Sequence, residues 1–278
     1  MSLEIPLMWA AVVLYVIGSI GFVIAAVFRL KRVLSLAFWI SMAGIVPHII
    51  SDILRWIQTG HGPYLGFYES VSSFALFSVI AFGLLVLWRR SYKAIGPFVM
   101  PLVFLLLGAA MLAPKSAVKI TSTLASLWLT IHVIFAQLSY TSLFIAFVLG
   151  ITWLVREKNG DTPKKGKGLL AKLPDQIVLD DTIFRFIAIG FIFWTIMIVS
   201  GAIWANQAWG RYWGWDAIET WSLITWLVYA VYLHLRLTMH WKGKKAVIYA
   251  VAAMPVVLFS LIGVPILFHS IHAAYLKL

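Results

Sequence analysis

The most chemically suggestive part of the chain is WANQAWGRYWGWDAIETW, which runs from Trp204 to Trp221 and holds five of the 14 tryptophans. Glycine and three charged residues are interleaved with these rings. A tryptophan offers a large flat apolar surface and one N–H donor, so five together predict a platform for a flat, hydrophobic partner. Tryptophan belts at membrane edges explain one or two such residues, but not five in this pattern.

Two of the seven histidines are expected at the height of these tryptophans. His132 precedes Arg156 by 24 residues, which is roughly 36 Å along a continuous helix. His272 follows Lys245 by 27 residues, which is roughly 40 Å. Two histidines at one height beside an aromatic platform fit axial ligation of haem iron.

The remaining residues of the stretch have predicted supporting roles. Arg211 is a candidate partner for a haem propionate carboxylate. Asp216 and Glu219 share a face if a helix starts there, and they either serve the site or only cap that helix. The rings expected to form the platform are Trp204, Trp209, Trp213 and Trp215.

Two further histidines are expected deep inside the membrane. His234 follows Glu219 by 15 residues, roughly 22 Å from the tryptophan level. His48 follows Arg32 by 16 residues, roughly 24 Å from the opposite edge. Ionisable residues within spans are functional candidates, although an interhelical hydrogen bond explains a lone histidine equally well.

The composition predicts an all-α polytopic membrane protein, with 62% hydrophobic and only 12% charged residues. We expect residues 1–278 to form a single domain with a retained first helix, because no basic region or cleavage site precedes Leu7. The predicted transmembrane helices are eight, at about 7–28, 33–57, 67–88, 95–113, 125–154, 183–205, 220–239 and 246–271.

The basic residues indicate how these spans are oriented. Of the 22 lysines and arginines, 17 fall on one side, which the positive-inside rule makes cytoplasmic. Both termini are then outside, with the tryptophan-rich loop 204–221 between the sixth and seventh spans. The loop 156–182 is expected to be a flexible basic linker near anionic lipid headgroups. The net charge of +12 is therefore a topology signal and not one for nucleic acid.

Three segments resemble the haem-handling proteins with a tryptophan-rich (WWD) signature, and most of all the CcsA/ResC type of cytochrome c assembly protein. GAIWANQAWGRYWGWDAIETWSLITWLVYAVYLHLR (Gly201 to Arg236) is similar to that signature. RWIQTGHGPYLGFYES (Arg55 to Ser70) is similar to a second signature, and LWLTIHVIFAQLSY (Leu127 to Tyr140) to the segment with the first external histidine.

The resemblance implies a plasma-membrane protein that conducts haem b outward and presents it to the CXXCH motif of apocytochrome c. His132 and His272 would bind the external haem, and His234 a transmembrane haem shared with a CcsB/ResB-type subunit. Such a chain is the haem-delivery subunit of a haem–cytochrome c ligase complex. Because the sequence has no cysteine, a thioredoxin-like thiol reductant must come from another protein.

The sequence departs from the family pattern in two places, and two other functions remain as alternatives. The family usually continues WD with Pro-Lys-Glu, whereas this chain has WDAIE; near the C-terminus HSIH offers His269 beside His272. The main alternative is a haem b-bearing membrane subunit that oxidises quinol. A transporter whose aromatic loop gates another amphipathic solute is a third interpretation.

Overall fold

The computed structural model describes residues 3–63, 65–115, 124, 126–160 and 168–268, and within these ranges the regular structure is helical. Two short 3₁₀ helices and one π-helical turn, η1 (Arg90–Ile95), η2 (Leu170–Lys172) and η3 (Phe259–Gly263), interrupt or connect the α-helices. The α-helices are α1 (Glu4–Val27), α2 (Lys31–Thr59), α3 (Phe67–Trp88), α4 (Gly96–Leu112), α5 (Leu127–Lys158), α6 (Gln176–Trp209), α7 (Ala217–Leu237), α8 (Lys244–Leu258) and α9 (Val264–Leu267).

Within the described residues the eight predicted spans are helical, so the expected fold class is confirmed. In the described part of the chain, seven helical stretches are long and apolar enough to cross a membrane, with η1–α4 and α8–α9 each counted as one. The remaining helix, α7, has 21 residues, enough for a span. Its mean hydropathy is lower than that of the other seven stretches, partly because tryptophan and tyrosine stand at positions where those stretches have aliphatic residues. The protein is therefore a multi-pass membrane protein.

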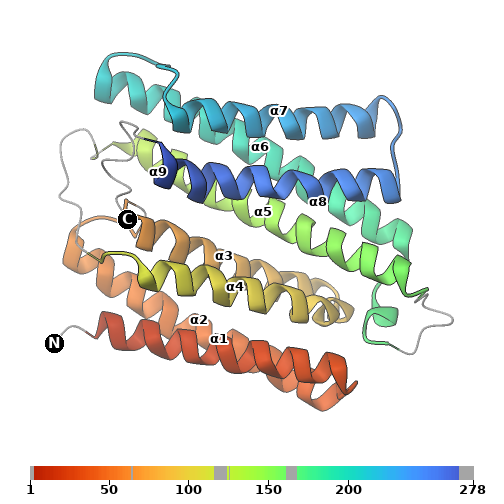
Figure 1. The fold of residues 1–278 in the computed structure, drawn as a ribbon. Helices are drawn as coiled ribbons and strands as arrows, with labels where there is room; N and C mark the ends of the chain where they lie inside the picture. The colour runs from red at the N-terminus through yellow and green to blue at the C-terminus, as the bar shows by residue number, and fades with distance from the viewer. Residues whose placement is uncertain (1–2, 64, 116–123, 125, 161–167, 269–278) are drawn as a thin grey trace.

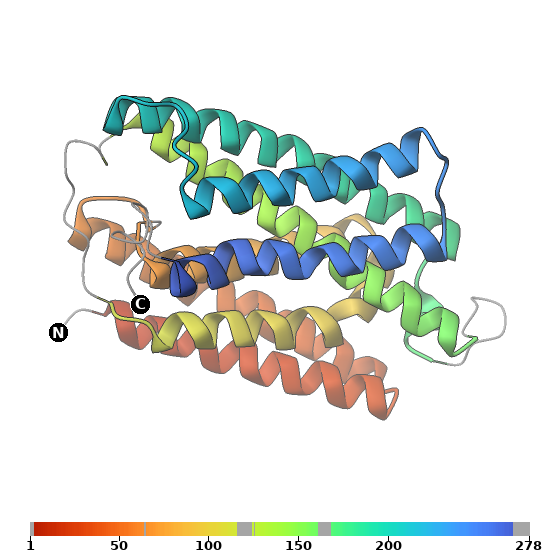
Figure 2. The ribbon, with the colours of Figure 1, turned by 45° about the horizontal axis from the view of Figure 1, so that its top comes forward.

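The long helices lie side by side and alternate in direction (Figure 1). α1 packs along α2, α3 along α4, and α5 along α6, while α5 also contacts α3 and α8 and so joins the two halves. In the turned view, α7 and α8 run beside α5 and α6, away from α1 and α2 (Figure 2). α5 is therefore the central helix.

The connections gather at two opposite ends of this bundle (Figure 1). We call one the tryptophan end, where α1 and α5 begin and α6 passes to α7. We call the other the basic end, where α1 passes to α2, α3 to η1, α5 to α6, and α7 to α8. Most of the basic residues and the tryptophan-rich stretch thus lie at opposite ends, as the sequence predicts. Which end faces the cytoplasm stays a prediction.

Two loops are shorter than expected, because the helices beside them are longer. Trp204 and Trp209 lie on α6 and Glu219 on α7, so the tryptophan loop proper is residues 210–216. At the basic end the connection is residues 159–175 and not 156–182. Arg156 is buried within α5, where its guanidinium donates to the carbonyl oxygens of Leu173 and Pro174. These bonds hold the chain entering α6.

Polar contacts fix α7 against α6 along its length. Near the tryptophan end the Trp194 indole donates to the Ser222 carbonyl oxygen at 3.0 Å. At the basic end the Arg236 guanidinium contacts Asp180 at 2.7 Å and Asp181 at 3.1 Å. Such contacts compensate for the weak hydrophobic drive between helices in lipid. They position the helix that follows the tryptophan loop.

Candidate functional site

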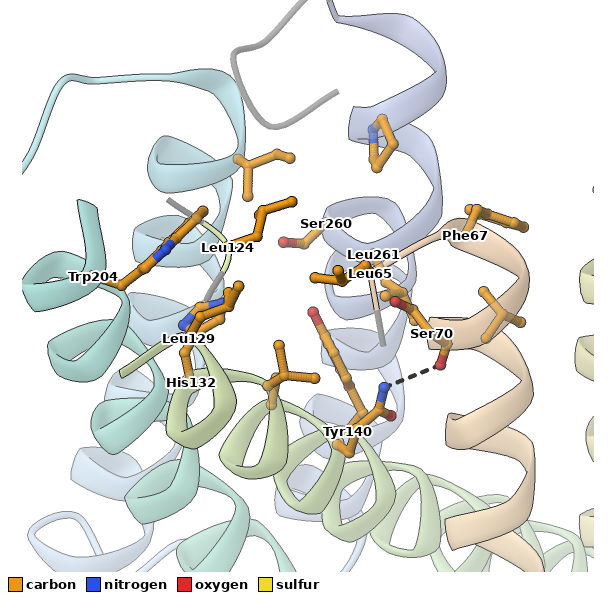
Figure 3. Close-up of a pocket in the computed structure, with 16 residues that line it drawn as sticks. Leu65, Phe67, Ser70, Leu124, Leu129, His132, Tyr140, Trp204, Ser260 and Leu261 are labelled. Carbon is orange, nitrogen blue, oxygen red and sulfur yellow. Dashed lines mark hydrogen bonds between the residues drawn. The ribbon is translucent and has the colours of Figure 1, made fainter. Parts of the chain in front are cut away.

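Two adjoining cavities lie at the tryptophan end. The first is enclosed by α3, α5, α6 and η3 and has a volume of about 150 Å³ (Figure 3). The second, of about 110 Å³, lies between α5, α6 and the tryptophan loop. Typical ligand pockets have about 300–1,000 Å³, so neither cavity alone has room for a flat macrocycle, and the two together are slightly smaller than that range. The residues in the shared wall are His132, Ala136, Tyr140, Trp204, Ile218 and Ser260.

His132 is the predicted ligand that the structure places in this shared wall. Its Nδ1 lies 2.8 Å from the Met197 carbonyl oxygen on α6. A carbonyl can only accept, so Nδ1 carries the proton and Nε2 carries the lone pair that a metal needs. Such an outer hydrogen bond orients a ligating imidazole and raises its basicity. His132 therefore has the tautomer required of an iron ligand.

Gly201 on α6 makes room for this imidazole. A Cβ atom at Gly201 would lie 2.6 Å from His132 Nδ1 and 2.9 Å from Cε1. Both distances are shorter than a normal van der Waals contact, so any larger residue would displace the ring. The close approach of α5 and α6 at this glycine thus sets the position of His132.

Trp204 and Trp209 form one wall of the site from the last turns of α6. Trp204 is only 4% exposed and lines both cavities. The Trp209 ring packs edge-to-face on it, with centroids 4.9 Å apart. Leu65, Leu124 and Leu129 complete an apolar cluster around Trp204. Trp209 lines neither cavity, and it supports the wall from behind.

The other two loop tryptophans differ in exposure. Trp213 lines the second cavity, and its indole Nε1 is buried without a hydrogen-bond partner among the described residues. Trp215 is 70% exposed, lines neither cavity, and has a φ of 57°, which is uncommon for a bulky residue. Their rings meet edge-to-face, with centroids 5.9 Å apart. Trp213 faces the site, and Trp215 faces outward.

Arg211 does not line either cavity. Its guanidinium lies across the loop, where a Cβ atom on Gly214 would be 0.9 Å from Arg211 Nη1. Only glycine allows this crossing. The structure brings Arg211 close to the loop backbone, and a contact between Arg211 and a bound carboxylate would need the side chain to move.

Asp216 and Glu219 form a capping box at the start of α7. Glu219 Oε2 accepts from the backbone N–H groups of Gly214 at 2.7 Å and Asp216 at 3.1 Å. The structure thus bears out the capping role for both, and this box begins the helix although WDAIE has no proline. Because Glu219 also lines the second cavity, it ties the loop to the site.

The two deeper histidines have contrasting surroundings. His48 is fully buried, with Nε2 2.9 Å from Ser72 Oγ and Nδ1 3.3 Å from Tyr15 Oη. These are interhelical hydrogen bonds among α1, α2 and α3. His234 is exposed on α7, near the exposed Val231 one turn earlier. The described contacts do not bring His48 and His234 together, and His269 and His272 lie outside the described residues.

One cluster at the tryptophan end was not predicted as a site. Arg55 contacts Glu69 at 2.9 Å and Glu4 at 3.6 Å, and all three side chains are buried. Arg55 also donates to the Lys115 carbonyl oxygen at 2.9 Å. Glu69 Oε2 accepts from the Leu65 N–H at 2.9 Å, and Leu65 lines the first cavity. The sequence signal that could have indicated this cluster is Arg55, a charged residue within an otherwise apolar span.

These helices and cavities define a multi-pass membrane protein with an aromatic, histidine-bearing site at one end. Residues 64–272 match the family model described as cytochrome C assembly protein. The chain therefore belongs to the cytochrome c assembly protein family.

Similar proteins agree with this assignment. The chain is 38% identical over 234 residues to cytochrome c biogenesis protein CcsA of Chlamydomonas reinhardtii, a match covering 80% of this chain and 63% of that one. It is 32% identical to the CcsA of Synechococcus sp. (strain CC9605), covering 92% and 95%. The solved structure of cytochrome c heme lyase CcmF has the same fold, with a TM-score of 0.69 at 15% identity. The match covers 93% of this chain but only 46% of CcmF.

Proposed function

We propose that this protein binds haem b at the tryptophan end and presents it for attachment to the CXXCH motif of an apocytochrome c. The observation that carries the proposal is His132, whose Nδ1–H is anchored to Met197 in a wall shared by two aromatic cavities. With the proton on Nδ1, Nε2 would be the nitrogen that binds the iron. The names of the similar CcsA proteins support a place in cytochrome c biogenesis.

The proposal assigns a partner to each part of the haem. His132 would bind the iron on one side, and His272 is proposed for the other, with His269 as its alternative. The Trp204 ring would pack on the macrocycle, and the buried Trp213 N–H would donate to an oxygen atom. Arg211 is proposed for a propionate after a side-chain movement. When bound, the haem supplies the vinyl groups that become thioethers.

His234 is proposed as a ligand for a second haem in transit through the membrane. It is exposed on an outer face of α7, where Leu227 and Val231 are 49% and 47% exposed. A histidine facing lipid is costly, so this face fits a partner subunit of the CcsB/ResB type that supplies the second histidine. A thioredoxin-like reductant would keep the apocytochrome thiols reduced.

The membrane sides follow from the charge distribution. We propose that the basic end is cytoplasmic and the tryptophan end extracytoplasmic, in a plasma membrane. A periplasmic reporter fused after Leu278 should then be active, and a cytoplasmic one should not. Activity of only the cytoplasmic reporter would reverse the orientation.

The central test is the visible spectrum of purified His132→Ala. We expect the haem absorbance to fall or shift, and added imidazole to restore it in part, because free imidazole can replace a ligand but not a packing residue. His240→Asn is the matched control, since His240 is exposed at the basic end. An unchanged spectrum in His132→Ala would place the ligand elsewhere.

A transfer test distinguishes haem delivery from electron transfer. The haem-loaded protein is mixed with a reduced apocytochrome c, and the covalent product is measured by haem staining after denaturing electrophoresis. Delivery predicts labelled cytochrome and loss of haem from this protein. A quinol-oxidising carrier would keep its haem and reduce it with quinol.

The order of travel is tested by comparing His234→Ala with His132→Ala. His234→Ala should deplete haem at both levels, because the outer site is filled from the inner one. His132→Ala should spare the inner haem. A fully occupied outer site in His234→Ala would make His234 a packing residue.

A further inference from the structure

The cations of the basic end fall into two groups. Arg236 pairs with Asp180 and Asp181, and Lys244 lies 3.5 Å from Glu157. A second group has no acidic group within 4.0 Å in the part of the chain that the structure describes. This second group includes Arg29, Lys31, Arg89, Arg90 and Lys172.

These five cations line two neighbouring hollows. Arg29 and Lys31, in the turn between α1 and α2, line one hollow together with Lys172. Arg89 and Arg90, between α3 and η1, line the other, again with Lys172. η1 and η2 are in contact, so the hollows lie next to each other. Asp175 is the one acidic side chain in either lining, which leaves a strong excess of positive charge.

A hydroxyl group in the second hollow lacks an acceptor. Ser91 Oγ is buried and has no hydrogen-bond partner among the described residues. Ser91 lines the hollow between Arg89, Arg90 and Lys172. Buried hydroxyl groups are normally hydrogen-bonded, and leaving one unsatisfied is unfavourable. An anionic oxygen in the hollow would satisfy it.

Exposed apolar side chains lie in the last turns of α3, just before Arg89, which lines the same hollow. Leu84, Leu87 and Trp88 are 61%, 73% and 65% exposed in the last turns of α3. The Trp88 ring stacks on Tyr92, at a centroid distance of 6.0 Å and an interplanar angle of 15°. Tryptophan is typical of the level of lipid headgroups. A ligand here would have an anionic head beside an apolar chain.

We propose that the hollow lined by Arg89, Arg90, Ser91 and Lys172 binds the headgroup phosphate of an anionic phospholipid. Basic pockets between transmembrane helices bind such headgroups. The acyl chains would lie along Leu84 and Leu87. The bound lipid would brace the connection into α6, since Leu173 and Pro174 line the same hollow and accept hydrogen bonds from Arg156.

The test is lipid-dependent stabilisation of the full-length protein in detergent. Phosphatidylglycerol should raise the apparent Tm, because a ligand that binds only the folded state stabilises it. Phosphatidylcholine with the same acyl chains should give a much smaller shift. In Arg89→Gln/Arg90→Gln the phosphatidylglycerol shift should disappear. The control is Lys242→Gln/Lys245→Gln, which removes two exposed cations of the same end that line neither hollow.

Ser91→Ala tests the hollow without changing its charge. Loss of one hydrogen bond to a charged group should weaken phosphatidylglycerol binding about tenfold. If both double variants lost the phosphatidylglycerol shift in Tm equally, the lipid would be attracted to the basic end as a whole and not to this hollow. That result would overturn the proposal. A shift of the same size with inorganic phosphate alone would make this a free-anion site and overturn the lipid assignment.

Discussion

Two regions of the tryptophan end each contain a histidine and a capping glutamate, but in different surroundings. We call Glu4, His48, Arg55 and Glu69 the closed corner, and His132, Trp204, Trp213 and Glu219 the open corner. Each has a glutamate three residues into a helix that accepts from backbone N–H groups of the preceding loop. In the closed corner Arg55 pairs with the two glutamates and His48 is hydrogen-bonded to neighbouring helices, whereas the residues of the open corner line the cavities.

The difference teaches that a histidine within an apolar span does not by itself indicate a ligand. In the closed corner both ring nitrogens of His48 are engaged by side chains of α1 and α3. In the open corner His132 is oriented by a backbone carbonyl and lines two cavities. The surroundings of the ring, and not its depth, separate a structural histidine from a candidate ligand.

The largest expected effect comes from breaking the closed corner at Arg55. Arg55→Gln removes the guanidinium that contacts both buried glutamates, Glu4 and Glu69, and breaking a buried ion pair costs about 3–5 kcal/mol. We expect a large drop in apparent Tm, measured by thermal unfolding in detergent. Arg185→Gln is the control, because Arg185 is exposed on α6. An unchanged Tm would show that the closed corner is not held by its charges.

A smaller effect is expected from crowding the open corner at Gly201. The new Cβ atom of Gly201→Ala would press on the His132 ring, and overpacking of this kind costs about 1–3 kcal/mol. Haem content, measured from the visible spectrum, should fall with it. Gly108→Ala is the matched control, because a Cβ atom there meets nothing within 4 Å. Equal haem content in both variants would contradict the role of the His132 position.

Removing the histidine of the closed corner should separate stability from haem binding. His48→Ala loses interhelical hydrogen bonds, each worth about 0.6–2 kcal/mol in membranes. The apparent Tm should fall modestly, while the haem spectrum of the folded protein stays the same. A haem spectrum altered as in His132→Ala would make His48 a ligand after all.

The smallest effect is expected at the cap of the open corner. Glu219→Ala removes the acceptor for the Gly214 and Asp216 N–H groups, and losing such a cap costs about 0.5–2 kcal/mol. The loop should loosen, so trypsin should cleave faster after Arg211, as measured by gel electrophoresis. Glu157→Ala, which removes an exposed pairing, should leave this rate unchanged.

Hydropathy and charge were enough to predict the helices and the two ends, because each span must bury its own backbone groups in lipid. They placed the helix boundaries less well. Trp204 and Trp209 continue α6 because their rings pack on each other and on leucines distant in sequence. The local sequence near residue 205 does not predict those contacts.

Within the candidate site, the sequence predicted His132 and the tryptophans but not what orients them. The Met197 carbonyl and Gly201 act through the crossing of α5 and α6, which no spacing rule reveals. Similarly, Arg211 and Trp215 lie in the predicted stretch yet line neither cavity. Their directions depend on the loop conformation, including the positive φ of Trp215.

The π-helical turn η3 changes the rotational register of the last helix. Such a turn accommodates one extra residue, and one residue corresponds to about 100° of rotation around a helix axis. Deleting a single residue within Phe259–Gly263 would remove the extra residue and leave Val264–Leu267 on their present face, whereas deleting one in the regular part of α8 would turn that face by about 100°. The wall that Ser260, Leu261 and Pro265 now form would then be lost. The length of this segment, as much as its chemistry, is therefore under constraint.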